Sequence, residues 1–155
     1  MQGERWLKFE LAAALTKHPE ISSLVLEDGY LANRRSDLSF VCEDEKYYVE
    51  MKTANTNWRV EGVENLHRPV TKNIAGIIEN IQILNKLAPT AHGIAVFTIF
   101  PIPERLLNEN QAKLNLHLDR IERVTNLELG SLRENMDYVP ISDQYGLGVF
   151  VINVV

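Results

Sequence analysis

One stretch, Arg34 to Thr53, constrains the fold of this chain more than any other. It reads RRSDLSFVCEDEKYYVEMKT, in which two apolar-rich runs flank a polar cluster at 43–46, and this pattern predicts a β-hairpin. Side chains alternate between the two faces of a strand, so each run gathers its apolar residues on one face. These two sets are Leu38, Phe40 and Cys42 on the first strand, and Tyr47, Val49 and Met51 on the second.

The length of the turn decides whether the two apolar sets share a face. Directly opposed residues of an antiparallel pair point the same way, so an even-numbered turn, Asp44-Glu45 or Glu43 to Lys46, joins the two sets. That register pairs Cys42 with Tyr47, Phe40 with Val49 and Leu38 with Met51. It also places Asp37 opposite Lys52 and diagonal to Glu50, which outlines a site for a metal ion and water. An odd-numbered turn would separate Asp37 from the other two residues.

Asp37 followed by Glu50-Met51-Lys52 on a later strand resembles the Asp…Glu-x-Lys signature of the PD-(D/E)XK nucleases, the restriction-endonuclease-like superfamily. Ser36 stands where a proline often precedes the aspartate in that family. The resemblance implies a divalent cation, Mg²⁺ with Mn²⁺ as a substitute, held by Asp37, Glu50 and the backbone carbonyl of Met51. It also implies that Lys52 orients or deprotonates the attacking water and stabilises the pentavalent phosphorus.

The first helix is expected over Glu4 to Lys17, with an apolar stripe of Leu7, Leu11, Ala14 and Leu15. Glu10 lies within that stripe, and a carboxylate there is costly unless something pairs with it. By resemblance, a first-helix glutamate adds an acidic group to the site, which makes Glu10 a candidate catalytic residue and Glu4 its substitute. The alternative is that Glu10 flanks the stripe and reaches solvent.

The remaining elements follow from apolar periodicity and from turn residues. We expect a strand at Leu24 to Glu27, a helix from Thr71 to about Leu87, a buried central strand at Gly93 to Phe100, a helix from Glu104 to about Leu127 with a break near 108–110, and a final strand at Leu147 to Val155. Together with the hairpin, this order matches the αβββαβ core of the resembled family over about Glu4 to Phe100. The expected class is therefore α/β, a restriction-endonuclease-like core with a central mixed sheet flanked by helices, extended by a C-terminal helix and strand.

Cationic and aromatic residues near the signature are candidates for contact with nucleic acid, which uses such groups for phosphate binding and base stacking. They are Arg34 and Arg35 before the aspartate, Trp58, Arg59 and Arg68 in the long loop Ala54 to Val70, and Lys72 at the start of the following helix. His67 in the same loop is a weaker candidate, as a metal ligand. The alternatives are solvated arginines at a strand edge, a loop pinned by its own apolar residues, and a lysine with no role.

Composition narrows the class of protein. A length of 155 residues with 45% hydrophobic content predicts one globular domain over 1–155. A single cysteine, Cys42, excludes an internal disulfide framework and a cysteine-based zinc cluster, and we expect a reducing, cytoplasmic setting. No apolar run is long enough to span a bilayer, so no membrane partner is expected. The net charge of -5 disfavours a coat protein on nucleic acid but not a nuclease with localised basic groups.

Three functions are compatible with the sequence. The first is a metal-dependent endonuclease acting on nucleic acid, with DNA as the expected substrate, and a homodimer would supply one site for each strand. The second is a catalytically idle nuclease fold used for binding or dimerisation. The third is an unrelated α/β interaction module, which an odd-numbered hairpin turn would favour.

Overall fold

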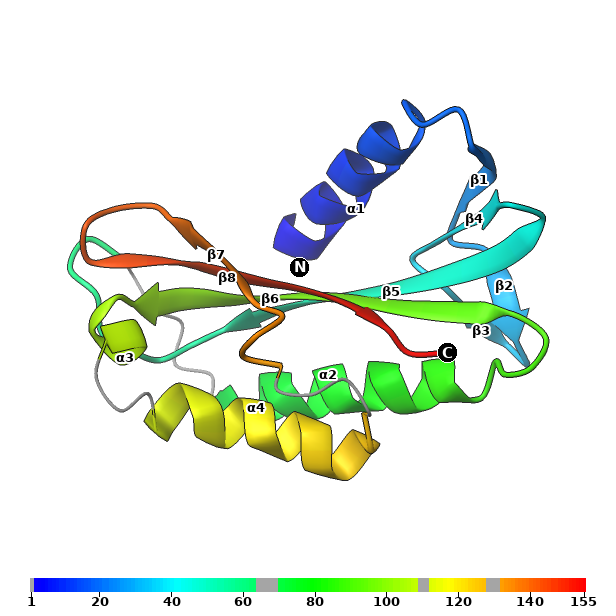
Figure 1. Cartoon of the computed structure of the whole chain (residues 1–155). Helices are drawn as coiled ribbons and strands as arrows, with labels where there is room; N and C mark the ends of the chain where they lie inside the picture. The colour runs from blue at the N-terminus through cyan, green and yellow to red at the C-terminus, as the bar shows by residue number, and fades with distance from the viewer. Residues whose placement is uncertain (1, 64–69, 109–111, 128–131) are drawn as a thin grey trace. The chain divides into compact units, whose positions relative to one another are not determined.

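The computed structural model describes residues 2–63, 70–108, 112–127 and 132–155 (Figure 1). The chain forms two compact units, and we describe each by itself. The first unit contains residues 1–51, 80–96 and 152–155, and the second contains residues 52–79 and 97–151.

The described residues form four helices, a six-stranded sheet and a separate two-stranded ladder. The helices are α1 (Gln2–Leu15), α2 (Val70–Asn85), α3 (Arg105–Asn108) and α4 (Ala112–Thr125). The strands are β1 (Ile21–Leu26), β2 (Gly29–Leu31), β3 (Arg34–Arg35), β4 (Leu38–Cys42), β5 (Glu45–Asn55), β6 (His92–Pro103), β7 (Asp137–Pro140) and β8 (Tyr145–Asn153). The sheet order is β1-β4-β5-β6-β8-β7, with β2 and β3 forming the ladder. The expected α/β class with a mixed sheet and flanking helices is confirmed. None of the described helices has the length and apolarity needed to cross a membrane.

The hairpin of β4 and β5 is confirmed, but its turn differs from both expected turns. Leu38 pairs with Val49 and Cys42 pairs with Glu45, so the two-residue turn is Glu43-Asp44. Both turn residues have positive φ, 51° and 62°, as a two-residue hairpin loop of the primed type requires. The expected pairs Cys42–Tyr47, Phe40–Val49 and Leu38–Met51 are therefore wrong by two residues. Because the offset is even, every side chain stays on its expected face.

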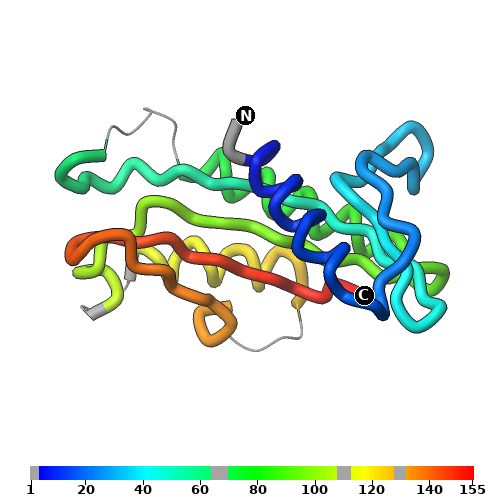
Figure 2. Tube along the Cα trace, turned by 90° about the horizontal axis from the view of Figure 1, so that it is seen from above, coloured from blue at the N-terminus to red at the C-terminus, as the bar shows by residue number. Residues whose placement is uncertain are grey.

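The first unit buries the apolar face of this hairpin under α1 (Figure 2). The buried cluster comprises Leu38, Phe40, Val49, Met51 and Val96. Leu7, Leu11 and Leu15 of α1 pack against it, as the expected apolar stripe requires. The other face of β5 is thereby left to its charged residues.

The strand β6 was expected to end at Phe100, but in the second unit it continues through Pro101 to Pro103. A proline lacks the N–H donor but keeps its carbonyl acceptor. Thr56 contacts the strand here: its N–H donates to Phe100 O at 2.8 Å, and its hydroxyl donates to the proline carbonyl Pro101 O at 2.5 Å. The carbonyls of Phe100 and Pro101 therefore have hydrogen-bond donors where β6 passes its first proline.

The C-terminal half of the second unit follows the sequence prediction with one addition. The expected long helix is divided into α3 and α4, and the stripe of Leu114, Leu118 and Ile121 on α4 is buried. Figure 1 shows α4 beside α2 on one side of the strands of this unit. The addition is β7, in a segment for which the sequence predicted no strand, and it pairs with β8 through Tyr138 and Gly148. At four residues ending in a proline, β7 carries little sequence signal for a strand.

Candidate functional site

Asp37 precedes β4, and backbone contacts fix its carboxylate next to β5. The Asp37 N–H donates to Val49 O at 3.1 Å, and the Met51 N–H donates to Asp37 Oδ2 at 2.7 Å. Continuing the hairpin register places Asp37 opposite Glu50, so the expected pairing of Asp37 with Lys52 is wrong by two residues. The preceding residue, Ser36, is buried and donates its N–H to Asp28 O at 2.8 Å, a bond that a proline could not make.

Glu50 is buried beside Asp37, and its environment opposes ionisation. The pKa of Glu50 is raised to about 7, chiefly by burial and also by the neighbouring carboxylate of Asp37, while the hydrogen bond from the Tyr30 hydroxyl and the charge of Arg34 act in the opposite direction. Glu50 therefore changes its protonation state near neutral pH. A bound proton or a nearby cation relieves the cost of its charge in this position.

Tyr30 donates a hydrogen bond from its hydroxyl to Glu50 Oε1, a contact that the sequence reasoning missed. Burial, followed by the hydrogen bond to Glu50, raises the pKa of the Tyr30 phenol, which keeps it a donor. Its ring stacks on that of Tyr48, with centroids 5.1 Å apart. The local signal was the turn pattern from Asp28 to Asn33, which folds β2 and β3 into a small ladder and returns Tyr30 toward β5.

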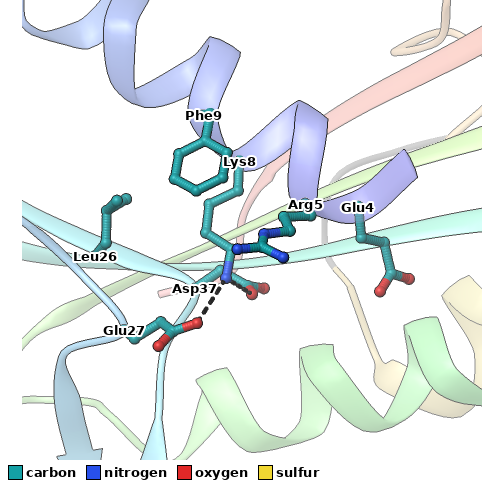
Figure 3. A pocket seen from close by; sticks show the side chains of 7 residues that line it. All are labelled: Glu4, Arg5, Lys8, Phe9, Leu26, Glu27 and Asp37. Atoms are coloured by element: carbon teal, nitrogen blue, oxygen red, sulfur yellow. Dashed lines mark hydrogen bonds and ion pairs between the residues drawn. The ribbon is translucent and has the colours of Figure 1, made fainter. Parts of the chain in front are cut away.

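Lys8, on α1, also contacts Asp37 (Figure 3). Its Nζ lies 3.5 Å from Asp37 Oδ1 and 3.2 Å from Glu27 Oε1. The three residues line a cavity of about 530 Å³ together with Glu4, Arg5, Phe9 and Leu26. Sequence reasoning also missed Lys8, although it lies one helical turn after Glu4 and beside the apolar stripe.

The structure does not bring Glu10 to this cavity. Glu10 is exposed and is absent from the described lining residues. Two residues along a helix differ in direction by about 200°, so Glu10 and Lys8 flank the apolar stripe on opposite sides. The solvent-reaching alternative for Glu10 is the one that the structure shows, and the substitute, Glu4, lines the cavity.

The pair of Asp37 and Glu50 fits a small divalent cation with few protein ligands. Mg²⁺ commonly binds through one or two carboxylates, with water and substrate oxygens completing its shell. The raised pKa of Glu50 next to Asp37 opposes its ionisation, and a cation bound at this pair would favour the ionised form. Among the described residues, no group of three or more His, Cys, Asp or Glu side chains is arranged to hold a metal ion. The structure shows the Met51 N–H donating to Asp37 Oδ2, whereas coordination of a metal ion by the Met51 carbonyl stays a prediction.

Lys52 belongs to the second unit, where its side chain packs closely on α2. A Cβ added at Gly76 would lie 3.0 Å from Lys52 Cε and 3.7 Å from its Nζ. Gly76 has no side chain, so it leaves this space open for the aliphatic stem of Lys52.

The residues expected to contact nucleic acid lie in different places. Arg34 and Arg35 are exposed on β3, and the charge of Arg34 acts on Glu50. Lys72 is exposed in the first turn of α2. Trp58 is buried and Arg59 is exposed, and both line a cavity of the second unit. Arg68 and His67 lie outside the described residues.

Comparisons of the chain with protein-family models, with curated proteins and with solved structures find no match.

Proposed function

We propose that this chain is a metal-dependent endonuclease that hydrolyses phosphodiester bonds in nucleic acid, with DNA as its substrate. The observation that supports the proposal best is the pairing of Asp37 with a buried Glu50 whose pKa is raised to about 7. Burial and the charge of Asp37 oppose ionisation of Glu50, and a divalent cation bound at this pair would favour the charged form of Glu50.

The chemistry needs an activated water and a counter-charge at the phosphate, and Mg²⁺ bound at Asp37 and Glu50 would supply both. The residues of the chain provide the orientation. The Met51 N–H holds Oδ2 of Asp37, and the Tyr30 hydroxyl holds Oε1 of Glu50. Glu50 gives up its proton when the cation binds, so binding is coupled to pH.

Lys52 would be the residue that orients or deprotonates the attacking water. It follows Glu50 by two positions on β5, and this spacing places both side chains on the same side of a strand. Its stem runs close to the backbone of α2 at Gly76, where the absence of a side chain leaves room for it.

A second candidate function, a catalytically idle binding or dimerisation module, is favoured by one specific contact. The Lys8 ammonium group lies 3.5 Å from Asp37 Oδ1, so the site already contains a cation of its own. If that ion pair outcompetes a divalent cation, the fold retains the signature without the activity.

The test is calorimetric titration of Mg²⁺ and Mn²⁺ into the wild-type protein and into Asp37→Asn and Glu50→Gln, with nicking of supercoiled plasmid measured in parallel. Asp44→Asn is the matched control, because it removes one carboxylate from the exposed turn of the same hairpin. We expect binding and nicking in wild type and control, loss of both in the two site variants, and loss of nicking alone in Lys52→Met. Wild-type protein that neither binds metal nor nicks DNA would support the idle module instead.

A further inference from the structure

The second unit contains a cationic cavity that is built from three separate segments. Its volume is about 490 Å³, within the range of pockets that hold small molecules. Three cations line it: Arg59 after β5, Arg105 on α3 and Lys113 on α4. The lining among the described residues includes no carboxylate. This grouping is unusual in a chain with a net charge of -5.

Among the residues that the structure describes, no carboxylate forms an ion pair with any of these three cations. All three are exposed. Arg105 also borders a neighbouring hollow that contains Glu104 and Asp143, but it forms no ion pair with either carboxylate in the described structure. Three like charges around one cavity repel one another, so an anion that enters it is stabilised by all three.

One wall of the cavity is apolar and aromatic. Leu116 is 68% exposed there, and the ring of His117 lies 6.2 Å from that of Trp58 at an angle of 44°. Burial and then the charge of Arg120 lower the pKa of His117, so its imidazole is neutral at physiological pH. Trp58 is 9% exposed and therefore supports this wall from behind. A flat ring of the ligand can pack on this wall while its anionic group meets the cations.

We propose that this cavity binds one nucleotide unit, with the phosphate held by Arg59, Arg105 and Lys113 and the base packed on Leu116 and His117. Guanidinium groups match phosphate oxygens in a bidentate manner, which makes arginine pairs suited to this ligand. The nucleotide can be free or part of a single strand. The site is distinct from the carboxylate pair, and its occupancy does not require cleavage activity or a divalent cation.

Trp58 provides a direct readout of binding. The chain has two tryptophans, and Trp6 is 64% exposed on α1 in the first unit, so Trp6→Phe leaves Trp58 as the only indole fluorophore. Fluorescence of this variant is titrated in EDTA with thymidine monophosphate, thymidine, inorganic phosphate and an oligothymidylate. We expect saturable binding of the monophosphate, of the oligothymidylate, or of both, at least tenfold tighter than thymidine and inorganic phosphate. The relative affinities of these two ligands identify the source of the nucleotide.

The variants Arg59→Gln and Arg105→Gln test the assignment, with Arg123→Gln as the control. Arg123 is an exposed arginine of α4 that does not line the cavity. Each site variant should weaken binding at least tenfold, and the control should leave it unchanged. All three positions are exposed, so the fold should persist, which circular dichroism can verify. Equal binding of thymidine and its monophosphate, phosphate binding as tight as that of the monophosphate, or unchanged affinity in both site variants would each overturn the proposal.

Discussion

The carboxylate site of the first unit and the cationic cavity of the second differ in how their charges are satisfied. At the carboxylate site, Asp37 contacts Lys8 and the Met51 N–H, and Glu50 contacts Tyr30. In the cationic cavity, Arg59, Arg105 and Lys113 form no ion pairs among the described residues. A cation bound at the first site must therefore compete with the Lys8 ammonium group and with the Glu50 proton, whereas an anion in the second displaces no ion-pair partner among the described residues.

This difference predicts two kinds of dependence on conditions. Metal binding at the first site requires Glu50 to release its proton, so this binding should depend on pH. Binding of an anion to the exposed cations of the cavity should depend on salt, because screening weakens the attraction between exposed charges. The two sites can therefore be separated by solution conditions as well as by mutation.

The largest expected effect is on cleavage. Asp37→Asn or Glu50→Gln should reduce plasmid nicking at least ~1000-fold, because each removes a carboxylate that would hold the metal. Neither variant should change nucleotide binding to the second unit by more than about twofold, since the cavity lining does not include them. Nicking rates and Trp58 fluorescence on the same preparations measure both quantities. Loss of both functions together would contradict two independent sites.

Metal affinity should fall as the pH is lowered through about 7. Below the raised pKa of Glu50 a proton must be released for each ion bound, so the affinity drops up to ~10-fold per pH unit. Calorimetry at pH 6, 7 and 8, in buffers with different enthalpies of ionisation, counts the released protons directly. Affinity that is constant over this range would show that Glu50 is already ionised in the free protein.

Nucleotide binding should have the opposite profile, weak in pH dependence and strong in salt dependence. The affinity for an oligothymidylate should fall steeply with salt, and Arg59→Gln should reduce the slope of log affinity against log salt by about 1. Anisotropy of a labelled oligonucleotide at several salt concentrations provides the slope. An unchanged slope in this variant would remove Arg59 from the phosphate site.

Glu50 should also make the metal-free protein less stable at higher pH. Its folded pKa is raised from 4.5 to about 7, so between these values the folded state holds a proton that the unfolded state releases. The free energy of unfolding should therefore fall by ~1–2 kcal/mol as the pH rises from 4.5 to 7, after allowance for partial solvent screening. Urea denaturation in EDTA measures this change, and Glu50→Gln should reduce it. A wild-type stability that rises over this range by the same amount would contradict the raised pKa.

The smallest expected effect concerns Lys8. Lys8→Met should raise metal affinity a few-fold, since it removes a cation that competes for Asp37 Oδ1, and a partly exposed ion pair contributes less than ~1 kcal/mol. Lys17→Met, at an exposed position just after α1, is the control for removal of a positive charge. Weaker binding in Lys8→Met would mean that Lys8 positions Asp37 instead of competing for it.

The sequence predicted the carboxylate site better than the cationic cavity, for a physical reason. Alternation along two adjacent strands places Asp37 and Glu50 on one side from local information alone. The cavity depends on how α3, α4 and the segment after β5 come together, so Arg105, Lys113 and His117 carry no common spacing that could reveal it. Of the residues that line the cavity, only Trp58 and Arg59, which are adjacent in the sequence, were expected to contact nucleic acid.

Within the first unit, the sequence prediction failed where only tertiary packing determines which of two similarly placed residues faces the site. Glu10 and Lys8 both flank the stripe of α1, and only contact with the sheet decides which flank faces the cavity. Tyr30 was missed because β2 and β3 are too short to show strand periodicity. The two-residue turn of the main hairpin lies one residue earlier than expected, because the run Glu43-Asp44-Glu45-Lys46 offers several polar turns.

The two-residue turn at Glu43-Asp44 has a consequence for how this protein can tolerate changes in chain length. An insertion of two residues there would lengthen the loop while both strands keep their buried and exposed faces. An insertion of one residue that shifted the register would direct Glu50 of β5 toward the buried face that Val49 and Met51 now occupy. Natural or engineered length variants of this hairpin should therefore survive in steps of two.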